Sequence, residues 1–106
     1  MAALGDSITR AFAACGRGGD CAETSWATGS AEHLDSHAQR LGLDDPDRSH
    51  NLAVSGARVT GLASQVEAAV RVRADYVTVL IGANDACAAD EAGMTSAEEY
   101  TTTFDA

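Results

Sequence analysis

The sequence has few aromatic and few basic side chains, and it has no long apolar run. Aromatic residues make up 5% of the 106 residues, so any core must be lined by Ala, Val and Leu. Seven basic residues stand against sixteen acidic ones, and the net charge of -9 repels nucleic-acid backbones and anionic membrane surfaces. The longest strongly apolar run, Val77 to Ile81, is far shorter than the ~20 residues that cross a bilayer, and no basic-then-apolar signal segment opens the chain. We therefore expect neither a nucleic-acid partner nor stable membrane insertion.

The cysteine count is low and odd, at three. Cys15 and Cys21 enclose the glycine-rich stretch 16–20, which is flexible enough to bring two sulfurs together in an oxidising compartment. The alternative is that all three are free thiols, as in a cytosolic protein. Pairing of Cys15 with Cys21 would leave Cys87 without a partner.

The length suits a single domain, 1–106, and the apolar spacing predicts strands that alternate with helices. Short apolar runs that end in glycine or serine predict the strands, and apolar residues one turn apart predict the helices. The expected strands are Met1–Leu4, Asn51–Val54 and Tyr76–Ile81. Four helices are expected: one that begins at Ser7, one that begins at a Ser30 cap and ends near Gly42, one from Val59 to Val70, and one that begins at a capping box from Thr95 to Glu98. Residues 14–28 are expected to form a surface loop that carries Trp26.

Strand and helix in alternation imply parallel strands, joined by right-handed crossovers, with helices on both faces of the sheet. The sequence therefore predicts an α/β fold, a three-layer α/β/α sandwich. In such a sheet every strand delivers its following loop to the carboxyl edge, where ligands bind. The loops Gly5-Asp6-Ser7, Ser55-Gly56 and Gly82-Ala83-Asn84-Asp85 should converge on one crevice there.

The polar groups expected in this crevice suit acyl transfer. A serine hydroxyl is a poor nucleophile until a base takes its proton and pre-aimed donors meet the oxyanion. A helix starting at Ser7 would turn free backbone N–H groups toward that charge. Gly56 can add an unobstructed backbone N–H, and the side-chain amide of Asn84 can donate a further hydrogen bond.

These three blocks, taken in order, resemble the first three blocks of the SGNH (GDSL) hydrolase family. The resemblance implies a serine hydrolase of carboxylic esters, lipase- or esterase-like, that works through an acyl-serine intermediate on a small-molecule or lipid ester and needs no metal or cofactor. It makes Ser7 the nucleophile and, through its backbone, an oxyanion donor, with Gly56 and Asn84 as the other donors. The run Ser25–Gly29 beside the cysteines is similar to bacterial, often secreted, members.

Each of these residues also has a purely structural reading. Ser7 would serve as a helix cap and Asn84 as a turn residue that tolerates left-handed backbone geometry. Asp6 and Asp85 receive no chemistry from the resemblance, and we expect them to accept turn hydrogen bonds that fix the two loops.

The family's remaining block, Asp-x-x-His near the carboxyl end, has no counterpart after Asn84. The one such spacing in the chain, Asp47 to His50, precedes the second strand, so at ~3.3 Å per residue His50 should lie some 20 Å from Gly56, at the wrong edge of the sheet. We expect these residues to be the amino-terminal part of a longer hydrolase, inactive alone. His33 and His37 are one turn apart but have no evident third ligand for a metal.

A flavodoxin-like sheet, which the resemblance implies, would pair these three strands in the order second, first, third. The strand 76–81 would then be an unprotected edge that invites self-association.

Two other functions are consistent with the same fold. One is an anion- or nucleotide-binding flavodoxin-like module, although the first loop lacks G-x-G-x-x-G spacing and a nearby lysine. The other is a catalytically inactive fragment that completes its sheet with a partner.

Overall fold

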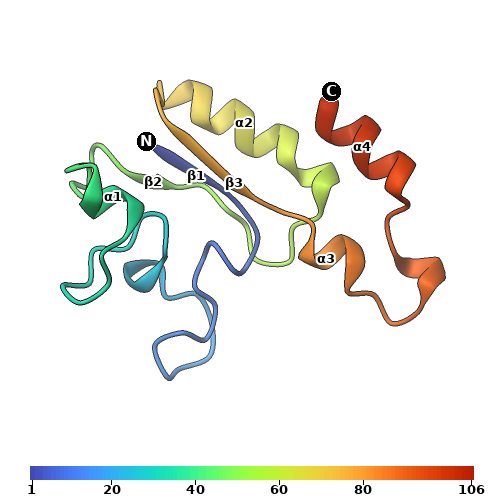
Figure 1. Ribbon diagram of the computed structural model, residues 1–106, viewed down its shortest axis with the longest axis horizontal. Coiled ribbons are helices and arrows are strands. Elements are labelled where there is room, and N and C mark those ends of the chain that lie inside the picture. Colours follow the sequence, from blue (N-terminus) through green and yellow to red (C-terminus); the bar gives the residue numbers. More distant parts are fainter.

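A three-stranded parallel sheet forms the centre of the molecule. The structure is a computed structural model and describes residues 1–106. Strand β1 (Ala2–Gly5) lies between β2 (His50–Asn51) and β3 (Val77–Leu80), as Figure 1 shows. Both pairings are parallel, and Ala2 lies opposite His50 on one side and Val77 on the other. The predicted α/β fold and strand order are confirmed.

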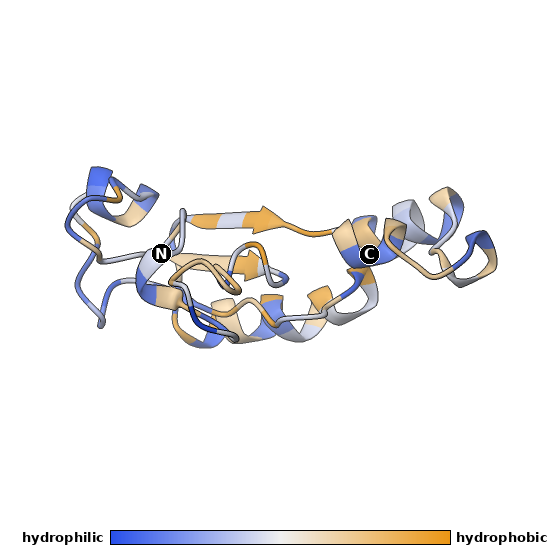
Figure 2. Ribbon diagram, turned by 90° about the horizontal axis from the view of Figure 1, so that it is seen from below, coloured by the Kyte–Doolittle hydropathy of each residue, from blue (hydrophilic) through white to orange (hydrophobic).

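One face of the sheet is covered by helix α2 (Leu62–Arg71), which follows a single 3-10 turn, η2 (Val59–Gly61). Leu62 and Ala69 of the helix pack on Ala2 and Leu4 of β1 to form the hydrophobic core. Strands β1 and β3 are among the more hydrophobic segments of the chain (Figure 2), whereas β2 consists of two polar residues. Every residue of β1 is buried, which fixes the segment that carries the first predicted loop.

The remaining elements are short. They are η1 (Ala22–Thr24), α1 (His37–Arg40), α3 (Ala83–Ala86), η3 (Glu91–Gly93) and α4 (Ala97–Asp105). None of the helices combines the length and the hydropathy of a membrane-spanning segment.

The helix predicted to begin at Ser7 does not form. Residues 7–15 make hydrogen-bonded turns instead, and Ala11 and Ala13 have positive φ angles of 52° and 59°, which a right-handed helix cannot contain. The reason is competition from the neighbouring loop. The backbone N–H of Ala13 donates to the carbonyl of Gly19 (2.8 Å), and the N–H of Cys21 donates to the carbonyl of Arg10 (3.2 Å).

The helix predicted from Ser30 is also much shorter than expected. It begins at a Ser36 cap, where the Ser36 hydroxyl accepts from the Gln39 backbone and the Gln39 side chain accepts from the Ser36 N–H. A continuous helix from Ser30 to Gly42 cannot form because Asp35 has a positive φ angle of 54°. The last helix shows a smaller error, since its cap is Ser96 rather than Thr95.

The segment predicted as a surface loop, 14–28, contributes buried residues. Cys21, Ser25 and Ala27 are fully buried. The side-chain amide of Asn51 in β2 donates to the carbonyl of Thr9 (2.9 Å) and reaches the Ser25 hydroxyl (3.3 Å). The irregular segment is therefore joined to the sheet by hydrogen bonds rather than by a helical face.

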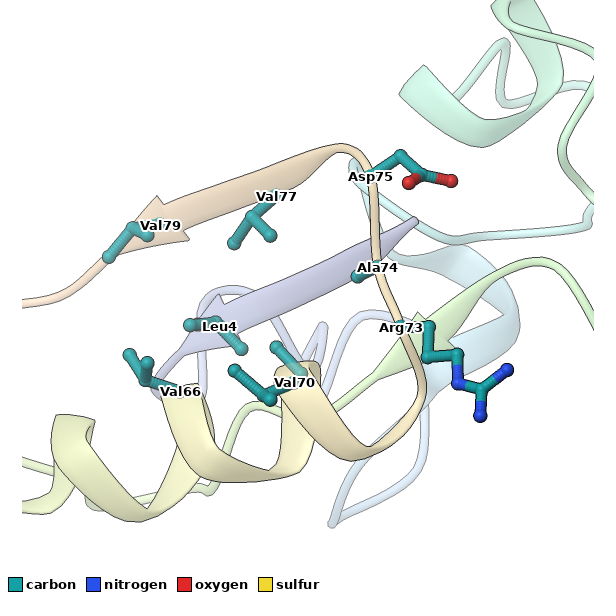
Figure 3. A pocket seen from close by; sticks show the side chains of 9 residues that line it. Leu4, Val66, Val70, Arg73, Ala74, Asp75, Val77 and Val79 are labelled. Carbon is teal, nitrogen blue, oxygen red and sulfur yellow. The ribbon is translucent and has the colours of Figure 1, made fainter.

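On the sheet face that carries α2, apolar side chains remain exposed near the β3 edge. Val77 and Val79 of β3 are each 42% exposed, and Val70 of α2 is 71% exposed, although the helix periodicity predicts it on the inner face. These residues, with Leu4 and Val66, line an open groove of about 420 Å³ between α2 and β3 (Figure 3). The prediction that 76–81 is an edge strand is confirmed.

Candidate active site

The first predicted loop leaves β1 at Gly5, where only glycine fits. Gly5 has φ +144°, and a Cβ atom there would lie 2.2 Å from the carbonyl oxygen of Leu80 in β3. Its N–H donates to Oε1 of Gln65 (2.7 Å), and its carbonyl accepts from Nε2 of the same side chain (2.9 Å). One buried amide thus satisfies both backbone groups of the residue that precedes Asp6-Ser7.

Gln65 is a positioning residue that the sequence analysis missed. It lies on α2 between Leu62 and Ala69, three residues after one and four before the other, so it shares their inner face. The signal that could have identified Gln65 is its polar side chain at a helix position that periodicity assigns to the core. A buried amide must find hydrogen-bond partners, so such a residue is expected to bind backbone groups of a neighbouring element.

Asp6 holds the turn that carries Ser7. Its side chain is fully buried, and its Oδ1 accepts from the N–H of Ile8 at 2.9 Å. The expected turn hydrogen bond of Asp6 is confirmed. Ser7 itself is partly exposed, so its hydroxyl lies within reach of a ligand.

The second predicted loop lies between the first and the third. Gly56 is exposed and has φ +85°, a left-handed geometry that suits glycine. On one side of it, the N–H of Val54 donates to the carbonyl of Gly5 at 3.1 Å. On the other side, the carbonyl of Ala57 accepts from the side-chain amide of Asn84 at 2.9 Å. Hydrogen bonds therefore connect the loops that carry Ser7, Gly56 and Asn84 at one edge of the sheet.

The third loop is fixed by Asp85, the neighbour of Asn84 in α3. The buried carboxylate of Asp85 accepts from the N–H of Val59 at 3.0 Å and from the hydroxyl of Thr95 at 2.7 Å. The expected hydrogen-bonding role of Asp85 is confirmed, with the difference that its partners lie outside its own turn. Asn84 remains partly exposed, beside this anchored carboxylate.

A third carboxylate, that of Asp20, connects the segment after Ser7 with the one before Gly56. It accepts from Nε of Arg10 at 2.9 Å and from the hydroxyl of Ser55. The hydrogen bond from Ser55, and next the one from Arg10, lower the pKa of Asp20 below its ordinary value. No periodic pattern could have predicted this contact, because Asp20 and Ser55 are 35 residues apart in the chain.

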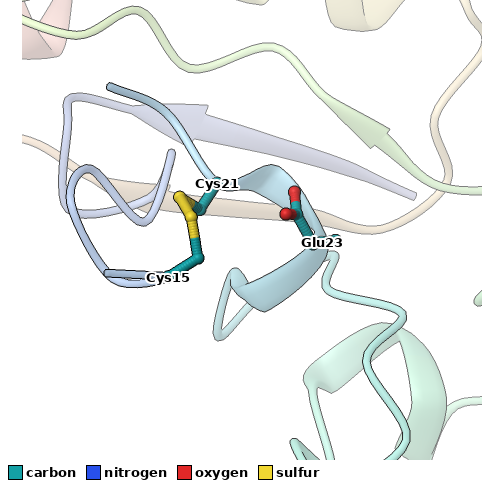
Figure 4. A group of neighbouring side chains, drawn as sticks. All are labelled: Cys15, Cys21 and Glu23. Carbon is teal, nitrogen blue, oxygen red and sulfur yellow. A yellow bond between two sulfur atoms is a disulfide. The ribbon is translucent and has the colours of Figure 1, made fainter. Parts of the chain in front are cut away.

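Asp20 is held in place by a disulfide. Cys15 and Cys21 are bonded, with their Cα atoms 6.0 Å apart, so of the two alternatives that the sequence left open the disulfide is the one present, and Cys87 is a free, exposed thiol. Glu23 lies next to the bonded sulfurs (Figure 4). These three side chains are the one cluster of potential metal ligands, and the disulfide removes both thiolates from it.

No hydrogen bond joins a histidine side chain to Ser7. His50 pairs with Ala2 at the amino end of β1, whereas Ser7 follows the carboxyl end, roughly 15 Å farther along the strand direction. The ring of His37 lies edge-on to Trp26 at 5.2 Å, with its Nδ1 3.3 Å from the Tyr76 hydroxyl. His33 is exposed and does not join His37 in a ligand cluster.

The fold and the loops agree with a comparison of the sequence with known families. A sequence model described as the GDSL-like lipase/acylhydrolase family matches residues 3–106. The chain belongs to this family. Membership supports an esterase or acylhydrolase activity in general terms. No curated protein and no solved structure gives a significant match.

Proposed function

We propose that this GDSL-family chain is the nucleophile-bearing part of a serine hydrolase of carboxylic esters. Ser7 is the nucleophile. The backbone N–H groups of Ser7 and Gly56 and the side-chain amide of Asn84 receive the oxyanion. The single observation that carries the proposal is the hydrogen-bonded connection of the three loops, through Val54 to Gly5 and through Asn84 to Ala57.

The reaction proceeds in two balanced steps. The Ser7 oxygen attacks the ester carbonyl carbon, and its proton passes through a base to the alcohol oxygen as the bond between carbonyl carbon and alcohol oxygen breaks. Water then attacks the acyl-serine with the aid of the same base, which releases the carboxylic acid and restores the hydroxyl. No redox step and no cofactor enters this sequence.

We also propose that the base does not come from this chain's own histidines. His50 lies at the amino edge of the sheet and His37 is engaged with Trp26 and Tyr76. A general base contributes about 10²- to 10⁴-fold to such a step, so the 106 residues alone should turn over ester at or near the buffer rate.

Chemical rescue tests both parts of the proposal. Added imidazole supplies a small mobile base, so the turnover of a p-nitrophenyl ester should rise several-fold above the imidazole-only rate, about the scale of a poorly positioned base. Ser7→Ala should abolish this increment, whereas Ser64→Ala, an exposed serine on α2, should leave it unchanged. Persistence of the increment in Ser7→Ala would remove Ser7 from the mechanism. Rapid labelling of Ser7 by a fluorophosphonate without imidazole would show that the chain has its own base.

The nucleotide-binding alternative loses its main structural support. It depends on a helix N-terminus beside the first loop. Residues 7–15 form turns rather than a helix, and α3 is a single turn of four residues.

A further inference from the structure

A cavity of about 420 Å³ opens directly beside Ser7. Ile8, Ala11 and Phe12, from the turns that replace the predicted helix, form one part of its lining. Trp26, from the segment after the disulfide, forms another. None of the lining side chains is charged, so the cavity suits an uncharged apolar group rather than a phosphate or carboxylate.

Two of the apolar lining side chains are half-exposed and therefore accessible to a ligand. Ile8 is 51% exposed and Phe12 is 55% exposed, whereas Asp6 at the start of the same segment is fully buried. Large apolar side chains that stay half-exposed around a concave site mark a binding surface. Positive φ at Ala11 is part of the irregular path that directs this segment around the cavity.

We propose that this cavity binds the straight acyl chain of the ester. The inference rests on the proposed role of Ser7, because the acyl group stays bonded to that serine through the intermediate whereas the alcohol leaves. The volume of the cavity limits the length of the acyl chain that it can hold. A dry cavity of about 150 Å³ holds benzene, so this open pocket of about 420 Å³ has room for a chain of at most about eight to ten carbons, part of which stays in contact with solvent. Medium-length acyl esters are therefore the preferred substrates.

Binding can be measured without turnover, because Trp26 is the chain's one tryptophan and its fluorescence reports on the cavity. The Ser7→Ala chain is titrated with methyl esters of straight alkanoic acids of increasing length. Each added methylene should lower Kd about fourfold until the chain has about eight to ten carbons, after which Kd should level off. A Kd that does not change with acyl length would overturn the proposal.

Two variants and a second ligand series complete the test. Phe12→Ala should weaken binding of methyl octanoate about tenfold. Phe104→Ala removes an equally exposed aromatic ring from α4, outside the cavity, and should have no effect. Equal weakening by both variants would indicate non-specific hydrophobic binding and overturn the assignment.

Alkyl acetates, which carry the chain on the alcohol side, should show the weaker dependence on length. A steeper dependence for acetates than for methyl esters would assign the cavity to the alcohol and contradict the acyl assignment. Length-dependent binding supports the cavity even if Ser7 proves not to be the nucleophile, so failure of the proposed mechanism and failure of this inference give different results.

Discussion

Two regions of the molecule differ sharply in regularity but not in how much they bury. The irregular region, residues 6–45, contains one four-residue helix and one short 3-10 turn, yet Cys21, Ser25 and Ala38 within it are fully buried. The regular region, residues 59–80, contains the longest helix and the most apolar strand, yet Val70 and Val77 there are 71% and 42% exposed. Regular secondary structure and burial are thus separate properties. Burial in the irregular region comes from hydrogen bonds and a disulfide between distant segments.

The largest expected effect lies within the regular region, at neighbouring positions of α2. Gln65→Ala leaves the N–H of buried Gly5 without a partner and removes one of the two donors to its carbonyl, and we expect a loss of about 3 kcal/mol in the free energy of unfolding. Val66→Ala, at an apolar position that is 46% exposed, should cost less than about 1 kcal/mol. Urea unfolding monitored by circular dichroism measures both. A larger loss of unfolding free energy for Val66→Ala than for Gln65→Ala would contradict the view that the buried amide matters more than the exposed apolar side chain.

The disulfide should rank next. Replacing Cys15 and Cys21 together by alanine releases the loop closure, and we expect a loss of about 2–3 kcal/mol. Cys87→Ala is the matched control, since that thiol is exposed and free, and it should change stability by less than about 0.5 kcal/mol. The double variant should also weaken ester binding in the cavity beside Ser7, which Trp26 fluorescence would detect. Unchanged stability would show that hydrogen bonds alone hold the irregular region.

A smaller effect distinguishes two serines. Ser25 is fully buried, and its hydroxyl donates to the carbonyl of Thr9 at 2.7 Å, so Ser25→Ala should cost about 1–2 kcal/mol. Ser64→Ala removes an exposed hydroxyl from α2 and should be almost neutral. Equal costs, measured by the same urea titration, would mean that the hydrogen bonds of the irregular region add nothing to its stability.

The pH dependence of stability should change when Asp20 is altered. The hydrogen bonds from Ser55 and Arg10 lower its pKa in the folded protein below the ordinary value of 3.8. The unfolded chain therefore takes up the proton first as the pH falls, so the stabilising contribution is complete above 3.8 and disappears as the pH falls through the lower folded pKa. Asp20→Asn should lose this part of the acid sensitivity. Identical slopes of stability against pH for the two proteins below about pH 4 would exclude the linkage.

The weakest effect concerns the exposed edge of β3. Self-association through 76–81 stays a prediction, and the net charge of -9 opposes it. Salt should therefore increase association, because at about 1 M the Debye length falls to about 3 Å. Light scattering over a range of concentrations would measure the mean mass. Val79→Lys should keep the chain monomeric under all conditions, and association that this variant leaves unchanged would exclude the edge.

The sequence predicted the regular region well and the irregular region poorly. Periodic apolar residues located β3 to within one residue at each end, and α2 to within three at its start, where residues 59–61 form a 3-10 turn, and one at its end. The same spacing at Ile8, Ala11 and Phe12 predicted a helix that does not form, because Gly19 and Cys21 of the neighbouring loop take up backbone groups that a helix would use. The spacing of apolar residues within one segment carries no information about hydrogen bonds that another segment makes to its backbone.

The candidate site was likewise predicted in part: the meeting of its loops was predicted, but the side chains that hold them were not. Glycine-terminated strands in a parallel sheet were enough to predict that the loops of Ser7, Gly56 and Asn84 meet at one edge. The residues that hold those loops, Gln65 and Asp20, were not predicted. Their partners lie 60 and 35 residues away in the chain, at Gly5 and Ser55.

The sequence by itself determined the three strands, the helix α2 between the second and the third, the glycines at the turns and the acidic charge, because these depend on single residues and their near neighbours. The tertiary structure decided which polar groups are buried, where the irregular segment packs, and that a half-exposed apolar cavity lies beside Ser7. The physical reason is that buried donors and acceptors must be paired, and in this chain many of the pairs join segments that no sequence period connects.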